Sequence, residues 1–524
     1  MADYVIAGSG INALVAASLL AMKGRKVLVL ERNAVTGGCM RTEEATVPDF
    51  THDVMATTFV LFLLSPAYGA LGKELEARGL SFAHPEIPTG VLRPDGSHLV
   101  LTRDRARNIA AFDALAEGDG AQYAADMGRL GANAPFLFAL LGGRLWSWDM
   151  AKMVAKEAWK RGPLGLSAFF GEALVSARHW LQPHYRSEEF HALMAPWVLH
   201  CGLGPESTYS GQMAKVIAFA LEAAGAPIVK GGAQNIIRAF ERLIRDHGGE
   251  IRTNADVAEV TVDDAGRATG VVLASGERIG ASEGVICSVT PNQLYGRLLK
   301  SWPGAAPQRE ETRGFAYGKG NMQIHYALKA PPRWKDPDLA KVALLHLTPG
   351  LDGVSKAVNE AERGMLPAEP TICLGQPTSF DPSRAPEGQS ILWLQLPECP
   401  RHIKGDAAGE IATPADGRWS EAVREAYADR IEDVLCRHIP DFRALVLARR
   451  CHSPADLEAM NINLTGGDPY GGACTIDQFF LWRPLRGLKN HETPVKRLWQ
   501  IGASTHPGPG LGGGSGFLLA SSLK

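Results

Sequence analysis

A glycine-rich turn between two short apolar runs constrains the fold of this 524-residue chain more than any other feature. The run from Asp3 to Ala7 has the pattern of a buried parallel strand. A helical pattern with small residues on one face follows the turn, and Lys26 to Leu30 then has the pattern of a second strand. The turn itself consists of Gly8, Ser9, Gly10, Ile11, Asn12 and Ala13. The sequence therefore predicts a strand–turn–helix–strand unit.

The residue types in this turn suit a dinucleotide. Gly8 permits a tight turn, Gly10 lets a pyrophosphate approach the backbone, and Ala13 keeps the helix close to the strand. The helix N-terminus offers unpaired N–H groups to the phosphates. Glu31, at the tip of the second strand, can accept both ribose hydroxyls of an adenosine and would repel a 2′-phosphate, which disfavours NADP. The pattern is the GxGxxG/A dinucleotide-binding fingerprint.

A second glycine pair helps to decide between FAD and NAD. Gly37 and Gly38 follow Glu31 closely, and Arg41 beyond them could pair with a phosphate. The joint pattern of fingerprint, acid, glycine pair and basic residue resembles the flavoprotein oxidoreductases of the amine oxidase and phytoene desaturase type. This resemblance implies FAD as the cofactor.

Two later segments carry the same resemblance. "KGGAQ" at 230–234 precedes an amphipathic helical stretch and several strand-like runs, and "LWQIGASTHPGPGLGGGSGF" at 498–517 reads as a strand, a glycine-rich loop and the start of a helix. The segment 461–485 and "GASTHPGPG" look most like the pyridine nucleotide-disulfide oxidoreductase domain 2 group, in a branch with phytoene desaturases, carotenoid isomerases and retinol saturase. Gly502 precedes Ala503, where amine oxidases usually carry an acid, and this departure weakens an amine oxidase assignment.

The resemblance implies a set of cofactor contacts. It places Val257 beside the adenine through backbone atoms, and the closing glycine stretch beside the ribityl chain and the flavin ring. The residues expected to contact FAD are Gly8, Ser9, Gly10, Ile11, Asn12, Ala13, Glu31, Arg32, Gly37, Gly38, Cys39, Met40, Arg41, Val257, Gly502, Ala503, Gly510, Leu511, Gly512 and Gly513.

The expected fold class is α/β, a Rossmann-type FAD-binding domain of the amine oxidase and phytoene desaturase kind with an inserted α+β substrate domain. The FAD-binding domain would be discontinuous and formed by residues 1–70, 226–295 and 455–524. Residues 71–225 and 296–454 would form the substrate domain. No second fingerprint has a strand–turn–helix context, so we expect no separate nicotinamide domain and an acceptor such as oxygen or a quinone.

Residues 134–180 combine apolar runs, basic residues and the indoles of Trp146, Trp148, Trp159 and Trp180. Such helices could lie on a membrane surface and admit a lipid-like substrate. The alternatives are an amphipathic cap over the substrate pocket or a subunit interface of a homo-oligomer.

Composition excludes several other classes. The net charge of −2 gives no reason to expect nucleic acid as a partner. The 8 cysteines form no CxxC pair and no His completes a ligand pattern, so we expect free thiols and no metal site. No secretory signal or membrane-spanning apolar run is evident, which favours a cytoplasmic location, with the inner-membrane periphery as an alternative.

The chemistry expected from the resemblance is hydride transfer between flavin N5 and a C–H or C=C of an apolar, isoprenoid-like or polyene substrate, in a desaturase, saturase or isomerase. Few catalytic side chains are needed for this. His506, in the closing glycine stretch, and His52, after the Arg41 loop, are the candidates for polarising the flavin or moving a proton.

Three other functions remain open at this point. A flavin amine oxidase would share the cofactor and the fold, and a non-catalytic flavin-binding scaffold would share the fingerprint. An NAD-only dehydrogenase is disfavoured by the pair Gly37 and Gly38 and by the terminal glycine stretch.

Overall fold

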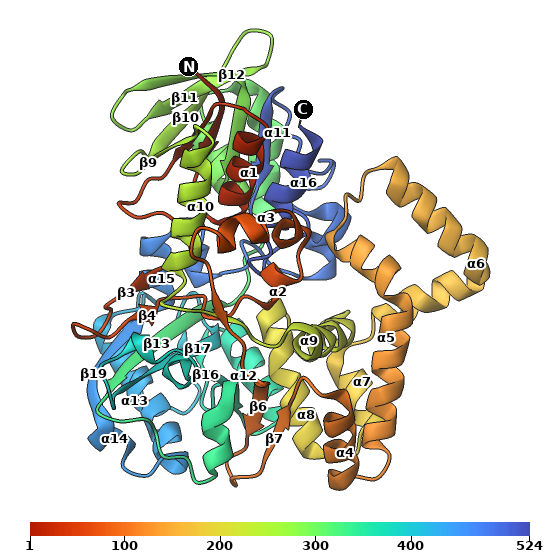
Figure 1. Cartoon of the computed structure of the whole chain (residues 1–524), viewed down its shortest axis with the longest axis vertical. Helices are drawn as coiled ribbons and strands as arrows, with labels where there is room; N and C mark the ends of the chain where they lie inside the picture. The colour runs from red at the N-terminus through yellow and green to blue at the C-terminus, as the bar shows by residue number, and fades with distance from the viewer. Residues whose placement is uncertain (524) are drawn as a thin grey trace.

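The computed structural model describes residues 1–523, which form two large sheets flanked by helices (Figure 1). The first sheet has the strand order β10-β11-β12-β1-β2-β9, with β20 beside β12. Strands β9, β2, β1, β12 and β20 run parallel, whereas β10, β11 and β12 are antiparallel neighbours. Their bounds are β1 (Ala2–Ala7), β2 (Val27–Leu30), β9 (Glu250–Arg252), β10 (Val257–Val262), β11 (Ala268–Leu273), β12 (Arg278–Ser288) and β20 (Leu498–Ile501).

Helices from both ends of the chain cover this first sheet. Helix α1 (Ile11–Met22) packs against α16 (Gly514–Ser522) and α10 (Gln234–Asp246), and α10 also contacts α3 (Pro66–Glu76). A side chain at Gly516 would place its Cβ 1.9 Å from the carbonyl oxygen of Asn12, so only glycine allows α16 to approach α1 this closely. The predicted strand at Leu498–Ile501 is confirmed, and the final helix begins before the predicted Phe517.

The second sheet has the order β19-β13-β17-β16-β14-β6-β7 and is mostly antiparallel. Helix α13 (Glu421–His438) covers one face, where Tyr427 and Ile431 pack with strand residues such as Ile324 and Leu394. The strands are β6 (Ile87–Leu92), β7 (His98–Leu101), β13 (Gly320–Leu328), β14 (Val342–Leu347), β16 (Ile372–Gly375), β17 (Ser390–Cys399) and β19 (Val446–His452). With strands and helices in both parts, the expected α/β class is confirmed.

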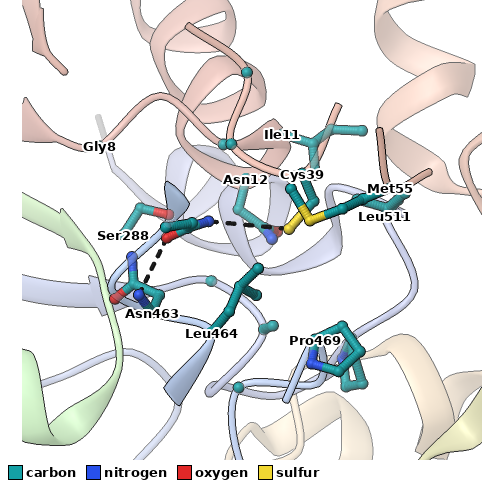
Figure 2. A pocket seen from close by; sticks show the side chains of 18 of the residues that line it. Gly8, Ile11, Asn12, Cys39, Met55, Ser288, Asn463, Leu464, Pro469 and Leu511 are labelled. Atoms are coloured by element: carbon teal, nitrogen blue, oxygen red, sulfur yellow. Dashed lines mark hydrogen bonds between the residues drawn. The ribbon is translucent and has the colours of Figure 1, made fainter. Parts of the chain in front are cut away.

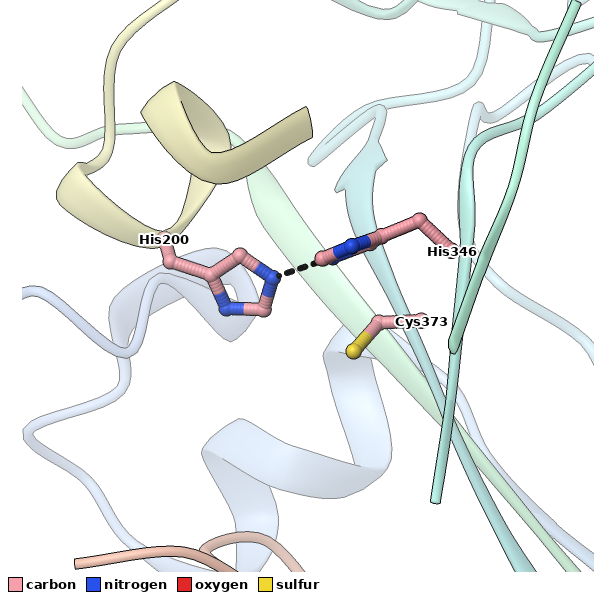
Figure 3. Close-up of side chains that lie close together, drawn as sticks. All are labelled: His200, His346 and Cys373. Atoms are coloured by element: carbon pink, nitrogen blue, oxygen red, sulfur yellow. Dashed lines mark hydrogen bonds between the residues drawn. The ribbon is translucent and has the colours of Figure 1, made fainter. Parts of the chain in front are cut away.

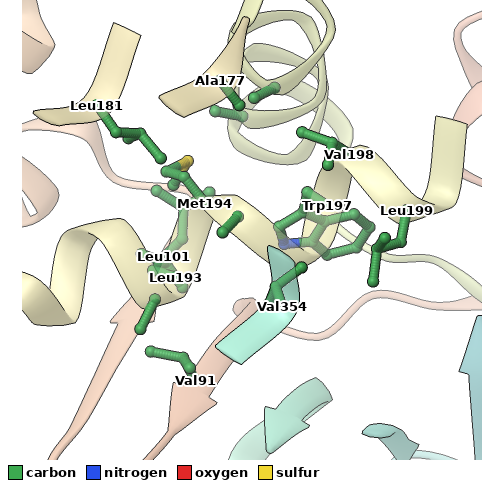
Figure 4. Close-up of a cluster of buried hydrophobic side chains, with 14 of the residues drawn as sticks. Val91, Leu101, Ala177, Leu181, Leu193, Met194, Trp197, Val198, Leu199 and Val354 are labelled. Carbon is green, nitrogen blue, oxygen red and sulfur yellow. The ribbon is translucent and has the colours of Figure 1, made fainter. Parts of the chain in front are cut away.

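A helical layer packs on the other face of this sheet. Its apolar cluster joins β6 and β7 to α7, α8 and the 3₁₀ helix η1, with Val91, Leu193 and Val198 fully buried (Figure 4). Burying this layer from water is the main driving force that holds it on the sheet. The helices are α4 (Arg105–Leu115), α5 (Asp119–Gly142), α6 (Trp148–Ala173), α7 (Ala177–His184), α8 (Glu188–Met194), η1 (Ala195–Cys201), α9 (Ser210–Ala224) and α12 (Leu351–Glu362).

Short elements complete the chain. They are β3 (Thr42–Glu43), β4 (His52–Asp53), α2 (Val60–Leu63), β5 (Phe82–Ala83), β8 (Ile228–Val229), η2 (Asn292–Leu298), η3 (Pro303–Ala305), α11 (Ala306–Glu311), η4 (Thr312–Gly314), η5 (Pro337–Lys341), β15 (Met365–Leu366), η6 (Pro377–Ser379), η7 (Pro382–Arg384), β18 (Gly405–Asp406), α14 (Phe442–Leu445), α15 (Pro454–Met460), η8 (Thr465–Gly467), η9 (Ile476–Gln478) and η10 (Phe480–Trp482).

Helix α6 stands away from the body of the molecule (Figure 1). Its path bends at Gly162, which has a φ of 71°, directly before Pro163. Trp148 and Trp159 are 83% and 92% exposed, whereas Trp180 is buried and donates its indole N–H to Asp126. Trp180 therefore does not belong to the exposed indole surface that the sequence suggested. Within residues 1–523, no helix is both long and apolar enough to cross a membrane.

A buried ion-pair network joins the two halves of the molecule. Arg384 has no exposed side-chain surface, and its guanidinium donates to Asp53 at 2.8 Å, to Asp381 at 2.9 Å and to the carbonyl oxygen of Val229 at 2.7 Å. Asp53 also accepts the backbone N–H of Ala233, the N-cap of α10, at 2.7 Å. The two guanidinium nitrogens that face Asp53 and Asp381 thus both donate charge-assisted hydrogen bonds.

We expect Arg384→Met to lower the free energy of unfolding by about 3–5 kcal/mol, because it leaves two buried carboxylates without their cation. Chemical denaturation of the purified protein measures this loss. The matched control is Arg252→Met, because Arg252 forms an exposed pair with Glu277 that solvent screens, and this variant should unfold at nearly the wild-type midpoint. Equal midpoints for the two variants would contradict the assignment.

Candidate cofactor and substrate site

A single cavity lies between the two sheets and is lined by residues from both. Figure 2 shows the part of it between the glycine turn and the loop that contains Asn463 and Pro469. On one side are the glycine turn and the loop after β2, and on the other are the loop at 461–471 and the strands of the second sheet. Of the residues expected to contact FAD, those that line this cavity are Gly8, Ser9, Gly10, Ile11, Asn12, Glu31, Arg32, Gly37, Gly38, Cys39, Val257, Gly502, Ala503, Gly510 and Leu511. The fold therefore brings the two ends of the chain and Val257 to one place.

The start of α1 is left open toward this cavity. Gly10 is the N-cap of α1 and forms no side-chain cap, so the first N–H groups of the helix are free to meet a ligand. A Cβ built on Gly10 would meet nothing within 4 Å. The space beside the turn is therefore empty of protein atoms, as a bound pyrophosphate requires.

Glu31 ties the turn to the second glycine loop. Its carboxylate is buried and accepts hydrogen bonds from the backbone N–H and the hydroxyl of Ser9, at 3.1 and 2.6 Å, and from the backbone N–H of Asn33 at 2.9 Å. The Ser9 hydroxyl in turn accepts the N–H of Gly37 at 3.1 Å. These hydrogen bonds hold the glycine turn and the Gly37 loop together at the end of β2. The contact of Glu31 with a ribose stays a prediction.

Five of the expected contacts lie outside the cavity lining. Ala13 and Met40 are fully buried in the core beside the first sheet, where they pack helix against strand. Arg41 pairs with Glu43. Gly512 lies near Leu61, and Gly513 forms the N-cap of α16. The structure gives these residues packing and loop contacts, and their contact with FAD stays a prediction.

The two histidines suggested for catalysis also lie outside the cavity lining. The ring Nε2 of His506 faces the carbonyl oxygen of Gly143 at 2.9 Å, which ties the closing loop to the end of α5. His52 is buried beside His325, with ring centroids 5.3 Å apart. Their catalytic roles stay predictions, and the cavity offers neither of them a direct contact.

The part of the cavity beyond the glycine loops is uncharged. The charged residues that line it are Glu31, Arg32, Asp256 and Arg297, and Arg297 donates to the carbonyl oxygen of Val257 at 2.9 Å, so all four lie at the dinucleotide end. The other end is lined by Met55, Trp197, His200, Asn321, Gln323, Leu344, Trp393, Gln395 and Tyr470. Sequence reasoning missed these residues, because they come from η1, three separate strands and two loops and share no local motif.

Hydrogen bonds to backbone fix two of the aromatic side chains of this uncharged end. The indole N–H of Trp393, on β17, donates to the carbonyl oxygen of Met55 at 3.1 Å, and the hydroxyl of Tyr470 donates to the carbonyl oxygen of Leu199 at 2.6 Å. The polar tips of Trp393 and Tyr470 are therefore satisfied by backbone. The buried indole nitrogen of Trp197 has no hydrogen-bond partner within residues 1–523. The cavity has a charged end suited to a dinucleotide and a neutral end suited to an apolar ligand.

A glycine turn at an open helix end, a buried acid after the second strand and a neutral chamber beyond them define an FAD-dependent oxidoreductase. Residues 14–428 match the family described as flavin containing amine oxidoreductase, and the chain belongs to this family. The resemblance stated from the sequence is confirmed, and so are the flavin cofactor and the fold class that it implied.

Curated relatives match over nearly the whole chain. The pyridine nucleotide-disulfide oxidoreductase domain-containing protein 2 of Rattus norvegicus is 28% identical over 98% of this chain and 92% of its own length. A limonene dehydrogenase subunit of Castellaniella defragrans is 24% identical over 99% and 94%. The zeta-carotene-forming phytoene desaturase of Myxococcus xanthus is 25% identical over 97% and 90%.

Among solved structures, a putrescine oxidase variant with redesigned cofactor binding superposes with a TM-score of 0.59. It shares 18% sequence identity, over 99% of this chain and 98% of that one. At this identity the likeness is one of fold.

We expect Gly10→Val to lose FAD without losing the fold. The added side chain enters space that is empty of protein atoms, and Gly10 has a φ of −66° that any residue tolerates, whereas a pyrophosphate would meet the new methyl groups. An overpacking cost of about 1–3 kcal/mol corresponds to roughly five- to 150-fold weaker retention. Flavin absorbance per protein measures it, and circular dichroism reports the fold.

The control for this variant is Gly128→Val. Gly128 lies in α5, and a Cβ there also meets nothing within 4 Å, but the site is remote from the cavity. The control should retain full flavin content. A Gly10→Val protein with wild-type flavin content would remove the pyrophosphate from this turn.

Proposed function

We propose that this FAD-dependent oxidoreductase moves a hydride between flavin N5 and a C–H or C=C bond of an apolar, isoprenoid-like substrate. The observation that carries the proposal is the neutral end of the cavity, where aromatic and aliphatic side chains such as Trp197, Leu344 and Trp393 lie beside uncharged polar side chains and no charged one. Charged substrates would find no counter-ion there, and apolar ones gain by leaving water. The names of the desaturase and dehydrogenase relatives support the same class.

The chain itself contributes binding, orientation and the exclusion of water. The glycine turn and Glu31 would hold the dinucleotide, and the closing loop at Gly502 and Ala503 would approach the flavin end. When bound, FAD supplies a two-electron hydride acceptor or donor. Because the sequence shows no second dinucleotide fingerprint, we propose oxygen or a quinone as the electron acceptor. We also propose that residues 1–70, 226–295 and 455–524 form the FAD-binding domain.

A flavin amine oxidase is the second candidate, because the family and the putrescine oxidase fold include it. The segment Gly502, Ala503 and Ser504 lacks the acid that amine oxidases usually carry after the last strand. The neutral end of the cavity favours the apolar substrate. Anaerobic flavin reduction by each class of substrate distinguishes the amine oxidase from the desaturase-type enzyme.

We expect anaerobic addition of an isoprenoid alkene or polyene to bleach the flavin absorbance of the purified holoprotein, while primary amines leave it unchanged. Stopped-flow spectroscopy measures the rate of bleaching, and dithionite provides the control for a reducible flavin. Bleaching by amines alone would establish the amine oxidase instead. A reducible flavin that no substrate class bleaches would favour the non-catalytic scaffold.

We further propose that α6 rests on an anionic membrane surface. At helical spacing, Trp148 and Trp159 lie on one face of α6 with Lys152 and Lys156 beside them, and all four side chains are exposed. Indoles insert at the lipid headgroup level, and lysines bind anionic headgroups. The projection of α6 from the body leaves this face accessible (Figure 1).

We expect the protein to float with vesicles that contain phosphatidylglycerol, and the double variant Trp148→Ser, Trp159→Ser to bind them at least roughly tenfold more weakly. Trp482→Ser is the matched control, because Trp482 is 43% exposed and lies outside α6. A wild-type protein that stays at the bottom of the gradient, or a double variant that floats like wild type, would contradict this proposal.

A further inference from the structure

Among the residues that line the cavity, His200 is the sole histidine. It lies in the 3₁₀ helix η1 and points across to His346, which comes from β14 (Figure 3). The two Nε2 atoms are 2.9 Å apart, which is hydrogen-bond distance. The function described so far uses neither ring.

At this distance one hydrogen lies between the two Nε2 atoms, and the tautomers of the two rings decide which Nε2 donates it. One Nε2 carries a hydrogen and donates, and the other accepts, so the two rings adopt different roles. His346 has no exposed surface, and its Nδ1 has no partner within residues 1–523. Burial lowers the pKa of His200 to about 4 and that of His346 well below its usual value, so both rings are neutral at neutral pH.

Packing holds the pair in place at the end of a polar row. The strand register aligns His452, Gln323, Gln395, Cys373 and His346 across the second sheet, on the face that lines the cavity. The ring of Trp197 lies 4.7 Å from that of His200 and 5.0 Å from that of His346, measured between centroids. Both imidazoles therefore have fixed orientations beside an aromatic wall.

Formation of a C=C bond removes two hydrogens from the substrate, one as a hydride and the other as a proton. One leaves with the bonding electron pair as a hydride to FAD, and the other leaves as a proton from the neighbouring carbon, whose C–H electrons form the new π bond. Loss of hydride next to an alkene leaves positive charge, which aromatic faces such as Trp197 and Trp393 stabilise. The adjacent C–H is then strongly acidic, so even an imidazole with a lowered pKa accepts its proton.

We propose that His200 is the catalytic residue that takes this proton, and that His346 is the positioning residue that holds its tautomer. When the Nε2–H of His200 donates to His346, the Nδ1 of His200 carries the free lone pair and becomes the base. The imidazolium that forms keeps its hydrogen bond to the neutral His346, as a base paired with an orienting group does. The reverse reaction returns the same proton. This assignment rests on the proposed desaturase-type function.

His200 and His346 also belong to a group of side chains with the composition of a metal site. The thiol of Cys373 completes a group of three donor atoms that lie within 4.8 Å of one another (Figure 3). Burial raises the pKa of this thiol, so the thiol stays protonated. A protonated thiol is a poor metal ligand. The proton-accepting pair needs no thiolate, and metal analysis separates the two readings.

The test compares His200→Gln and His346→Gln with His247→Gln, an exposed histidine after α10. With a substrate that bleaches the wild-type flavin, we expect flavin reduction to slow by roughly 10²–10⁴-fold in the first variant and about 10–100-fold in the second. Flavin content and substrate binding should stay unchanged, and added imidazole should partly restore His200→Ala. Reduction of His200→Gln at the wild-type rate would overturn the proposal.

Nitrogen NMR of protein labelled with ¹⁵N-histidine needs no substrate, so it distinguishes failure of this pair from failure of the proposed function. We expect His200 to carry its hydrogen on Nε2, and His346→Gln to shift the His200 signals while His247→Gln leaves them in place. A hydrogen fixed on Nδ1 of His200 would overturn the assignment. Metal analysis that finds one equivalent of zinc in the wild-type protein and none in His346→Gln would also overturn the assignment and would establish a metal site.

Discussion

The buried contact of Arg384 with Asp53 and Asp381 is the interaction on which the rest of the architecture depends. It connects a strand of the N-terminal part, the loop before α10 and the second sheet at one desolvated point. A charge removed from water is stable only when its partners are fixed. Because the cavity walls come from both halves of the molecule, the position of each wall relative to the other follows from this junction.

The junction produces a cavity with two chemically different ends. Gly10 and Glu31 provide an open helix N-terminus and an acceptor at the dinucleotide end, whereas Trp197 and Trp393 line a neutral chamber. One end suits phosphates and ribose, and the other suits apolar carbon. The histidine pair lies at the neutral end, and because both rings are neutral the pair adds no permanent charge to the chamber.

Local patterns predicted more of the dinucleotide end than of the substrate end. The βαβ unit, Glu31 and the closing strand Leu498–Ile501 follow from short-range periodicity and glycine placement, and they lie where a fingerprint requires them. The choice of His506 and His52 relied on proximity in sequence to those motifs. The structure places both side chains outside the cavity lining: His506 faces the carbonyl oxygen of Gly143, and His52, on β4, packs beside His325. Their catalytic roles stay predictions.

The sequence by itself determined the cofactor class, because a phosphate-binding turn is a contiguous motif whose backbone geometry is set by its own residues. The tertiary structure alone decided which side chains line the neutral end of the cavity and which lie directly behind them. His200 and His346 are 146 positions apart, and a strand register together with the packing of η1 brings their rings to 2.9 Å. Such a contact depends on how separate elements pack, and no local spacing encodes it.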